Sequence, residues 1–470
     1  MTVLDDIRSR AATSPARTAI AAAHGADGAV DESVSYGALV AAMDRCSALV
    51  RTVLDGPARR VGLVAPQGAG FVTAALGILD AGCCLVPIPD DQSEAATREF
   101  AERSQLHALV RSDFSVEPIA SAAAPTDEFA AIDPAYLRFT SGTTSERKGV
   151  VISHARILER LTAANRGMAV TADDRVLWLL PMAHHFVVSI LLYLRNGATI
   201  LLPANSLARS VLQLAAHTEP TVFYASPYHY SLLGKDVSEQ RLDSLRLAVS
   251  TAEGLREDTA ERFRERFDRD LVQALGIIEV GLPVMNLDSA ARKPTALGRA
   301  LPDYDVWLRG EDGQPVLGDG SPATCGEVCI RGPGMFNAYL DPWTPSDTVL
   351  EPDGFRTGDQ GWYDSDGDVH LIGRRANRIN MAGMKFFSEE VEAVLDRHPA
   401  IERSRVSARE HSHLGQIPIA EIVLRAGSEE PAARSLADFC KEHLAAYKIP
   451  RQFAVVATLP MTATGKVSRH

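Results

Sequence analysis

The chain is poor in the residues that define disulfide scaffolds and zinc modules. Its 470 residues include six cysteines, none of them in a Cys-x-x-Cys pair, and most lie in apolar runs. We therefore expect reduced thiols in the interior, as in cytoplasmic proteins. The first residues also lack the basic segment and apolar core of a signal peptide. The expected location is the cytoplasm.

An excess of positive charge and a long apolar run are also missing. The net charge is −12, which argues against nucleic acid as a partner because phosphate backbones attract basic surfaces. The longest apolar stretch, residues 187–202, is interrupted by Arg195 and Asn196 and is too short to cross a bilayer. We expect no nucleic-acid partner and no membrane partner, in a protein that is a monomer or a homodimer.

The chain does contain alternating strand and helix patterns. Apolar strand patterns at 61–65, 83–88 and 108–111 alternate with helical patterns at 69–80 and 94–104. Such alternation favours a parallel α/β sheet. Residues 112–133 are typical of a surface connection, after which the strand patterns resume, at 176–180, 198–202, 221–224 and 245–250.

The pattern changes after Tyr304. Short strands separated by Asp-Gly pairs predict a small antiparallel β unit. A helix at 388–397, which Ser388 could cap, a helix at 432–444, and strands at 418–424 and 453–457 predict a small C-terminal domain. The predicted fold class is α/β: a large N-terminal domain of parallel α/β sheets with the antiparallel unit, then a small mobile α+β domain.

One stretch, Phe139–Val150, combines hydroxyls, a glycine and the cation Lys148. This composition suits a loop that wraps phosphate, and it equally suits an ordinary surface turn. A Walker A loop is excluded, because Arg147 replaces a required glycine and Gly149 replaces the Ser or Thr.

Further polar clusters follow strands or turns, as ligand sites do at strand ends of parallel sheets. They are Pro-Met-Ala-His-His-Phe at 181–186, Gln-Ala-Leu-Gly-Ile-Ile-Glu at 273–279, Arg-Thr-Gly-Asp at 356–359, Gly-Arg at 373–374 and Thr-Gly-Lys at 464–466. In this order they resemble the AMP-forming adenylating superfamily, which includes acyl-CoA synthetases, luciferase and nonribosomal peptide synthetase adenylation domains. The nearest likeness is to stand-alone aryl-acid adenylating enzymes.

The resemblance implies a domain division and a reaction. Residues 1–372 would form the adenylation core, 373–377 a hinge, and 378–470 a mobile domain carrying Lys466. ATP and a small carboxylic acid, aryl or other, would give acyl-AMP and pyrophosphate. The acyl group would then pass to coenzyme A or to a carrier-protein phosphopantetheine.

The resemblance also assigns roles to individual residues. Lys466 would bridge the carboxylate and the α-phosphate, Glu279 would hold Mg²⁺, and His184 would act at the acyl group. The nucleotide would contact Thr140, Ser141, Gly142, Thr143, Thr144, Lys148, Thr251, Ala252, Glu253, Leu275, Gly276, Asp359 and Arg374. The acid would contact His184, His185, Ser189, Gly276 and Ile277.

Several positions depart from the family pattern. Ser145 and Arg147 replace glycine and proline in the phosphate loop, Ile278 replaces a threonine, and Ala376 replaces the hinge Asp or Lys. His185 and Ile190 replace an asparagine and a serine of aryl-acid enzymes, which weighs against a dihydroxybenzoate-type substrate. Transfer to a nitrogen or oxygen nucleophile is an alternative that shares every motif, and retention of the predicted catalytic residues argues against a lapsed enzyme.

Overall fold

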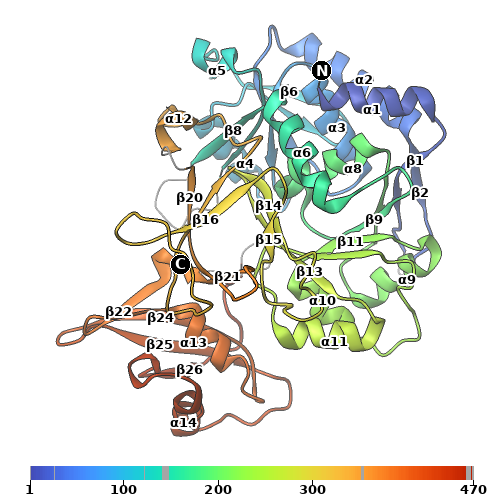
Figure 1. Ribbon diagram of the computed structural model, residues 1–470. Helices are drawn as coiled ribbons and strands as arrows, with labels where there is room; N and C mark the ends of the chain where they lie inside the picture. Colours follow the sequence, from blue (N-terminus) through green and yellow to red (C-terminus); the bar gives the residue numbers. More distant parts are fainter. Residues whose placement is uncertain are drawn as a thin grey trace. The chain divides into compact units, whose positions relative to one another are not determined.

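The computed structural model describes residues 2–25, 27–120, 122–139, 148–350, 354–461 and 467, and the chain is traced in Figure 1. The chain divides into two compact units. Unit 1 comprises Met1–Thr295, Arg299–Asp305 and Arg331–Pro352, and unit 2 comprises Ala296–Gly298, Val306–Ile330 and Asp353–His470.

Unit 1 is built on two large sheets. The described strands of the first follow the order β15-β14-β13-β12-β11-β9-β10-β1-β2, and its centre from β13 to β1 is parallel. Their bounds are β1 Thr18–Ala22, β2 Glu32–Ser35, β9 Arg175–Trp178, β10 Thr199–Leu202, β11 Val222–Ala225, β12 Leu247–Ser250, β13 Leu271–Ile277, β14 Gly281–Met285 and β15 Arg299–Ala300. The antiparallel strands β2, β14 and β15 lie at its edges.

The second sheet follows the order β19-β18-β8-β7-β4-β3-β5-β6. Its strands are β3 Arg60–Val64, β4 Cys84–Ile88, β5 Ala108–Arg111, β6 Val116–Pro118, β7 Pro134–Phe139, β8 Gly149–Ser153, β18 Ala338–Tyr339 and β19 Thr344–Pro345. Strands β7, β4, β3 and β5 are parallel, whereas β7 and β8 are antiparallel. The strands that flank the predicted phosphate loop are therefore hydrogen-bonded to each other.

Helices cover both sheets of unit 1. They are α1 Val3–Thr13, α2 Tyr36–Val53, α3 Ala69–Asp80, α4 Glu94–Arg103, α5 Asp127–Ala131, α6 His154–Met168, α7 Met182–His185, the π-helix η1 Phe186–Ile190, α8 Leu191–Asn196, α9 Ala208–Thr218, α10 Pro227–Gly234, α11 Glu257–Phe267 and α12 Ser346–Val349. Helices α9, α10 and α11 pack their apolar faces onto β9, β11 and β12. Apolar side chains at helical spacing form these faces because burial removes them from water.

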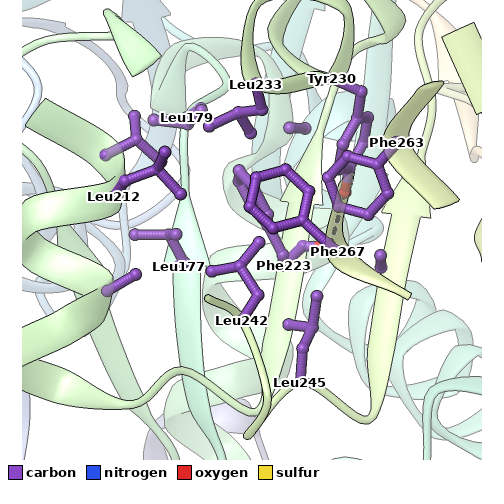
Figure 2. Close-up of a cluster of buried hydrophobic side chains, with 14 of the residues drawn as sticks. Leu177, Leu179, Leu212, Phe223, Tyr230, Leu233, Leu242, Leu245, Phe263 and Phe267 are labelled. Carbon is purple, nitrogen blue, oxygen red and sulfur yellow. Dashed lines mark hydrogen bonds between the residues drawn. The ribbon is translucent and has the colours of Figure 1, made fainter. Parts of the chain in front are cut away.

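Figure 2 shows the core beneath these helices, where Phe223, Tyr230, Phe263 and Phe267 pack together. Tyr230 is fully buried, and its hydroxyl donates to the backbone oxygens of Phe223 at 3.0 Å and Val249 at 2.9 Å. A buried hydroxyl must find such acceptors, since leaving it unpaired costs about 1–3 kcal/mol. These bonds fasten α10 to β11 and β12.

Unit 2 contains two smaller sheets. Strands β16 Asp305–Arg309, β17 Gly326–Arg331, β20 Phe355–Tyr363 and β21 Val369–Arg374 form one of them. The other contains β22 Arg378–Met381, β23 Met384–Phe387, β24 Ile401–His411, β25 Gly415–Leu424 and β26 Phe453–Val455. Helices α13 Ser388–Leu395 and α14 Ala433–His443 share a core with this second sheet, and the short 3-10 helices η2 Arg375–Asn377 and η3 Ala446–Lys448 complete the unit.

The predicted α/β fold class is confirmed, and most expected elements are present within one or two residues. Four local interpretations were wrong. Residues 112–133 contain β6 and α5; Arg356–Asp359 lies inside β20 and not among turns; and Gly373 and Arg374 end β21 instead of starting a connector. Ser388 is the first residue of α13, and the cap is made by Glu390, whose Oε1 accepts the N–H of Phe387 at 2.8 Å.

The domain boundaries at residues 372 and 378 stay predictions. In the described ranges, no helix has both the length and the apolar character that a membrane crossing requires.

Candidate active site

Glu279 lies in the turn between β13 and β14, and its side chain is buried. It is 9% exposed, and its Oε1 accepts the hydroxyl of Tyr339 at 3.2 Å. Burial raises the pKa of the Glu279 carboxyl, although the Tyr339 hydrogen bond and the charges of Arg138 and Arg160 act in the opposite direction. A glutamate that only capped a helix at the surface would be exposed to water. The turn instead presents a carboxylate that has little water around it.

Arg160 of α6 holds the turn that carries Glu279. Its Nη1 donates to the backbone oxygen of Ile278 at 3.0 Å, and its Nε donates to the oxygen of Gly334 at 2.9 Å. The guanidinium is almost fully buried, and this burial lowers the pKa of Arg160 to about 10. Bonds to two carbonyls offset part of the cost of burying the charge.

Lys148 follows the predicted phosphate loop and lies over the Tyr339 ring. Its Nζ is 4.7 Å from the ring centroid, a cation–π contact. The contact arises from strand pairing, because Tyr339 is opposite Val150 in the antiparallel β18–β8 ladder. Tyr339 therefore contacts a predicted phosphate ligand with its ring and the predicted metal ligand with its hydroxyl.

His184 lies in α7 and is bound by Arg138 of β7. Arg138 donates from Nη1 to the backbone oxygen of His184 at 2.7 Å, and its Nη2 is 2.9 Å from the ring Nδ1. Tyr136, two residues earlier in β7, donates its hydroxyl to the oxygen of Ala183 at 3.0 Å. Burial and, next, the charge of Arg138 lower the pKa of His184 to about 4.

His185 belongs to an aromatic group at the ends of β9 and β11. Trp178 and Tyr224 stack with ring centroids 5.2 Å apart, and the His185 ring is edge-on to Trp178 at 5.6 Å. Burial raises the pKa of Tyr224, while hydrogen bonds with Ser189 and Thr251 act to lower it. Ser189 lies in the π-helix η1, an uncommon element that is frequent at functional sites.

Two predicted nucleotide-binding segments lie on neighbouring strands: residues 251–253 follow β12, and Leu275 and Gly276 belong to the last residues of β13. Thr251 donates its hydroxyl to the oxygen of Ala274 at 3.0 Å, which joins the two segments. Ala252 has a φ of 75°, so the chain turns sharply after Thr251. A Cβ on Gly276 would meet nothing nearer than 3.9 Å, so packing does not require a glycine at this position.

Asp359 and Arg374 both belong to unit 2 and form a cross-strand pair of β20 and β21. Arg374 Nε donates to Asp359 Oδ1 at 3.1 Å. Asp359 is buried, at 8% exposed, while 57% of the Arg374 side chain is exposed. Glu327 supports this region: its Oε2 accepts from Nη2 of Arg356 at 2.6 Å, and its Oε1 accepts the N–H of Gly358 at 3.2 Å.

The predicted site residues divide between the two units and the part of the chain that is not described; Asp359 and Arg374 belong to unit 2. Lys148, Glu279, His184, His185, Ser189, Thr251, Ala252, Glu253, Leu275, Gly276 and Ile277 belong to unit 1. Thr140, Ser141, Gly142, Thr143, Thr144 and Lys466 lie outside the described residues, as do Ser145 and Arg147.

The donor chemistry at Glu279 fits Mg²⁺. Over the described ranges, no three His, Cys, Asp or Glu side chains gather into a cage for a metal ion. Mg²⁺ does not require one, because beside nucleotides it uses one or two carboxylates, phosphate oxygens and water. Glu279 offers one buried carboxylate in the turn after a parallel strand.

Comparison with known proteins decides the family. Residues 7–340 match the family described as AMP-binding enzyme, and residues 390–466 match the AMP-binding enzyme C-terminal domain. The chain belongs to the AMP-binding enzyme family. The predicted superfamily and enzyme class, an AMP-forming ligase, are confirmed.

Individual relatives of this AMP-binding enzyme are distant. An uncharacterized acyl-CoA ligase of Bacillus subtilis is 25% identical over 100% of this chain and 97% of that protein. A 3-[(3aS,4S,7aS)-7a-methyl-1,5-dioxo-octahydro-1H-inden-4-yl]propanoyl:CoA ligase of Mycobacterium tuberculosis is 28% identical, covering 88% of each chain. An anthranilate CoA ligase solved with anthranoyl-AMP shares the fold, with a TM-score of 0.83, 23% identity, and coverage of 99% of this chain and 95% of that one.

Sequence reasoning missed five side chains that support the site of this AMP-binding enzyme: Arg138, Tyr136, Trp178, Tyr224 and Tyr339. Arg138, Trp178 and Tyr224 lie close to the carboxyl ends of β7, β9 and β11, which was a usable signal, whereas Tyr136 lies in the middle of β7. Tyr339 had no such signal, because its strand β18 comes from a segment nearly two hundred residues further along and pairs with β8.

Proposed function

We propose that this enzyme activates a small carboxylic acid with ATP and then passes the acyl group to the thiol of coenzyme A. In the first step a carboxylate oxygen attacks the α-phosphorus, the bond to the β-phosphate oxygen breaks, and pyrophosphate leaves. In the second step the thiol sulfur attacks the acyl carbon, AMP leaves with the bonding electrons, and the thiol proton passes to solvent. Family membership and the acyl-CoA ligase relatives support this reaction.

The observation that carries the proposal is the contact series Lys148–Tyr339–Glu279. Two anions, a carboxylate and a triphosphate, must approach each other, so the site must supply positive charge. Lys148 supplies a cation at the end of the proposed phosphate loop, whose members are Thr140, Ser141, Gly142, Thr143 and Thr144. When bound at Glu279, Mg²⁺ would neutralise phosphate charge.

The other nucleotide contacts are proposed from the family motifs. Thr251, Ala252 and Glu253 would frame the adenine, and Leu275 and Gly276 would also contact the nucleotide. The buried carboxylate of Asp359 would accept hydrogen bonds from the ribose hydroxyls, and Arg374, which holds Asp359, would assist. Lys466 would bridge the carboxylate and the α-phosphate. The C-terminal residues 378–470 would rotate at the hinge 373–377 between the two steps, so that Lys466 serves only adenylation.

An aryl acid fits the proposed acid pocket well. His184, His185, Ser189, Gly276 and Ile277 would line it, and Trp178 and Tyr224 add a stacked aromatic wall beside His185. Flat apolar side chains pack well against a flat ring. The fold neighbour with anthranoyl-AMP holds an aromatic acid, which agrees with this choice.

The acceptor and the setting remain parts of the proposal. Coenzyme A is the first choice, a carrier-protein phosphopantetheine the second, and a nitrogen or oxygen nucleophile the alternative from another class. We further propose a cytoplasmic enzyme, monomeric or homodimeric, with neither nucleic-acid nor membrane partners.

The test is acid-dependent exchange of labelled pyrophosphate into ATP over a panel of aryl and aliphatic acids. We expect exchange with one or more aryl acids, and formation of a thioester when coenzyme A is added. Glu279→Gln should reduce exchange by roughly 10²–10³-fold, because the substitution removes a metal ligand's charge at nearly constant volume. Glu257→Gln, at the start of α11, is the matched control and should exchange normally. Absence of exchange with every acid would refute adenylation of that panel, and exchange without thioester formation would direct the search to the other acceptors.

A further inference from the structure

The Arg138–His184 contact is unusual because one cation binds both the backbone and the ring of a predicted active-site histidine. The two bonds, 2.7 Å to the backbone oxygen and 2.9 Å to Nδ1, leave from different nitrogens of one guanidinium. When Nη1 and Nη2 of a planar guanidinium both bind one partner, they fix the position and the orientation of that partner.

The chemistry of these two groups determines where the imidazole proton lies. A guanidinium has five N–H donors and no acceptor. Nδ1 of His184 must therefore accept, which makes the ring neutral and places its proton on Nε2. Protonating Nδ1 would set an N–H against an N–H, next to a fixed positive charge.

We propose that Arg138 is a positioning residue that holds His184 as the Nε2–H tautomer, with Nε2 as a hydrogen-bond donor toward the acid or its adenylate. The identity of the group that accepts the hydrogen bond from Nε2 rests on the proposed function. The tautomer itself does not.

The surroundings of His184 support this assignment. Among the described residues, Arg138 is the charged group that acts on the ring, and the Tyr136 hydroxyl contacts the adjacent carbonyl of Ala183. His185 is directed at Trp178, and Glu279 acts on Arg138, where it opposes the effect of burial on the pKa of that guanidinium. A neutral donor is useful here, because it stabilises charge that develops on an oxygen and does not depend on the pH.

The contact predicts a specific effect of changing Arg138. Arg138→Met removes both donors and the charge, Arg138→Gln removes the charge but keeps an amide donor, and Arg138→Lys keeps the charge. Without the neighbouring cation the smaller of the two causes that lower the pKa of His184 is removed, so this pKa rises, while burial still holds it below the ordinary value of about 6.5. Tyr136→Phe is the matched control, because it removes a hydrogen bond to the same helix and no charge.

The first readout is ¹⁵N NMR of histidine-labelled protein between pH 5 and 8. His184→Gln identifies the resonances of this ring among the 13 histidines. In the native protein and in Arg138→Lys we expect a ring with an unprotonated Nδ1 that does not titrate above pH 5. In Arg138→Met we expect the Nδ1 resonance to shift and the ring to begin to protonate toward pH 5, because the cation is gone while burial remains. Arg138→Gln should show the same change if the methionine variant does not fold. Unchanged His184 resonances in a folded Arg138→Met or Arg138→Gln protein would overturn the proposal.

The second readout is the pH dependence of adenylation. The ratio of variant to native kcat/KM should fall as the pH is lowered from 8 to 5 for Arg138→Met, and should stay constant for Arg138→Lys and Tyr136→Phe. A ratio that does not change with pH for Arg138→Met would also count against the proposal. The NMR readout needs no substrate, so it distinguishes failure of this inference from failure of the proposed reaction.

Discussion

Tyr339 donates its hydroxyl to Oε1 of Glu279 at 3.2 Å while its ring lies 4.7 Å beneath Nζ of Lys148. One side chain thus contacts a cation and a carboxylate that are 131 positions apart in the chain. Both contacts depend on the register of the two-residue strand β18 against β8. Substitution can remove the hydroxyl alone, or the hydroxyl and the ring together.

Tyr339→Phe should retain the contact with Lys148 and remove the hydrogen bond to Glu279. That bond opposes the effect of burial on Glu279, so its loss should raise the pKa of the carboxyl further. Less Glu279 is then ionised at a given pH, and the acid limb of adenylation should move to higher pH. Tyr339→Leu should in addition increase the KM for ATP. The measurement is the pH profile of pyrophosphate exchange, and equal profiles for the native protein and Tyr339→Phe would contradict the prediction.

Asp359→Asn should reduce the enzyme's preference for ATP over 2′-deoxy-ATP. An amide is uncharged and accepts on one side only, so the proposed contact with the ribose hydroxyls weakens by about 1–3 kcal/mol, or roughly 5- to 150-fold. The measurement is the ratio of kcat/KM for the two nucleotides. Asp366→Asn, in the exposed turn after β20, is the control and should keep the native ratio. A ratio that Asp359→Asn leaves unchanged would show that Asp359 does not bind the ribose hydroxyls.

Lys466→Ala should abolish adenylation and largely spare thioester formation from supplied acyl-AMP. The lysine lies outside the described residues, and its proposed role is confined to neutralising charge in the first step. The two half-reactions are measured separately with the same enzyme preparation. Unchanged pyrophosphate exchange in Lys466→Ala would show that another group neutralises the charge in adenylation.

Acid should destabilise the protein already between pH 7 and 5. Burial is the main cause that lowers the pKa of His107, His184 and His229 to about 4, below the value near 6.5 of an unfolded histidine. The unfolded chain therefore binds more protons in this range, and the free energy of unfolding falls as pH falls. The slope approaches about 1.4 kcal/mol per pH unit for each such histidine.

His107 lies outside the proposed site, so its contribution to the loss of stability in acid can be tested separately. Its Nδ1 accepts the N–H of Arg60 at 3.0 Å, and its Nε2 is 3.0 Å from the oxygen of Ala123. His107→Gln should be less stable at pH 7 and should lose less stability than the native protein on going to pH 5. Urea unfolding at both pH values measures the difference. Parallel losses in the two proteins would show that His107 does not contribute to the acid sensitivity.

Local sequence patterns were sufficient to predict helices and strands whose apolar residues recur at a regular spacing. The helix Ala69–Asp80 and the strand Ala108–Arg111 have the predicted ends, because Gly, Ser and charged residues bound clear apolar runs. Arg356–Asp359 was misplaced because glycine and aspartate usually indicate turns, whereas here pairing with β21 keeps the segment extended. Strand pairing over a distance overrides such local preferences.

The motifs point to individual residues, whereas the neighbours that support those residues carry no motif. Glu279, His184 and Asp359 were proposed from their motifs, and their roles stay predictions; Glu279 and Asp359 are buried and His184 is partly buried. The partners of these residues, Tyr339 and Arg138, were not identified, because their contacts depend on tertiary structure and no local pattern signals them.

The segment Arg331–Pro352 belongs to unit 1, although the chain enters it from unit 2 and leaves it for unit 2. A fragment that stops before Arg331 would contain most of unit 1 but would lack β18. The edge of β8 would then present unpaired N–H and C=O groups, and an open strand edge invites pairing between molecules. Dividing this protein into independently expressed halves would therefore require a peptide that restores β18, and the same peptide would return the tyrosine that binds Glu279.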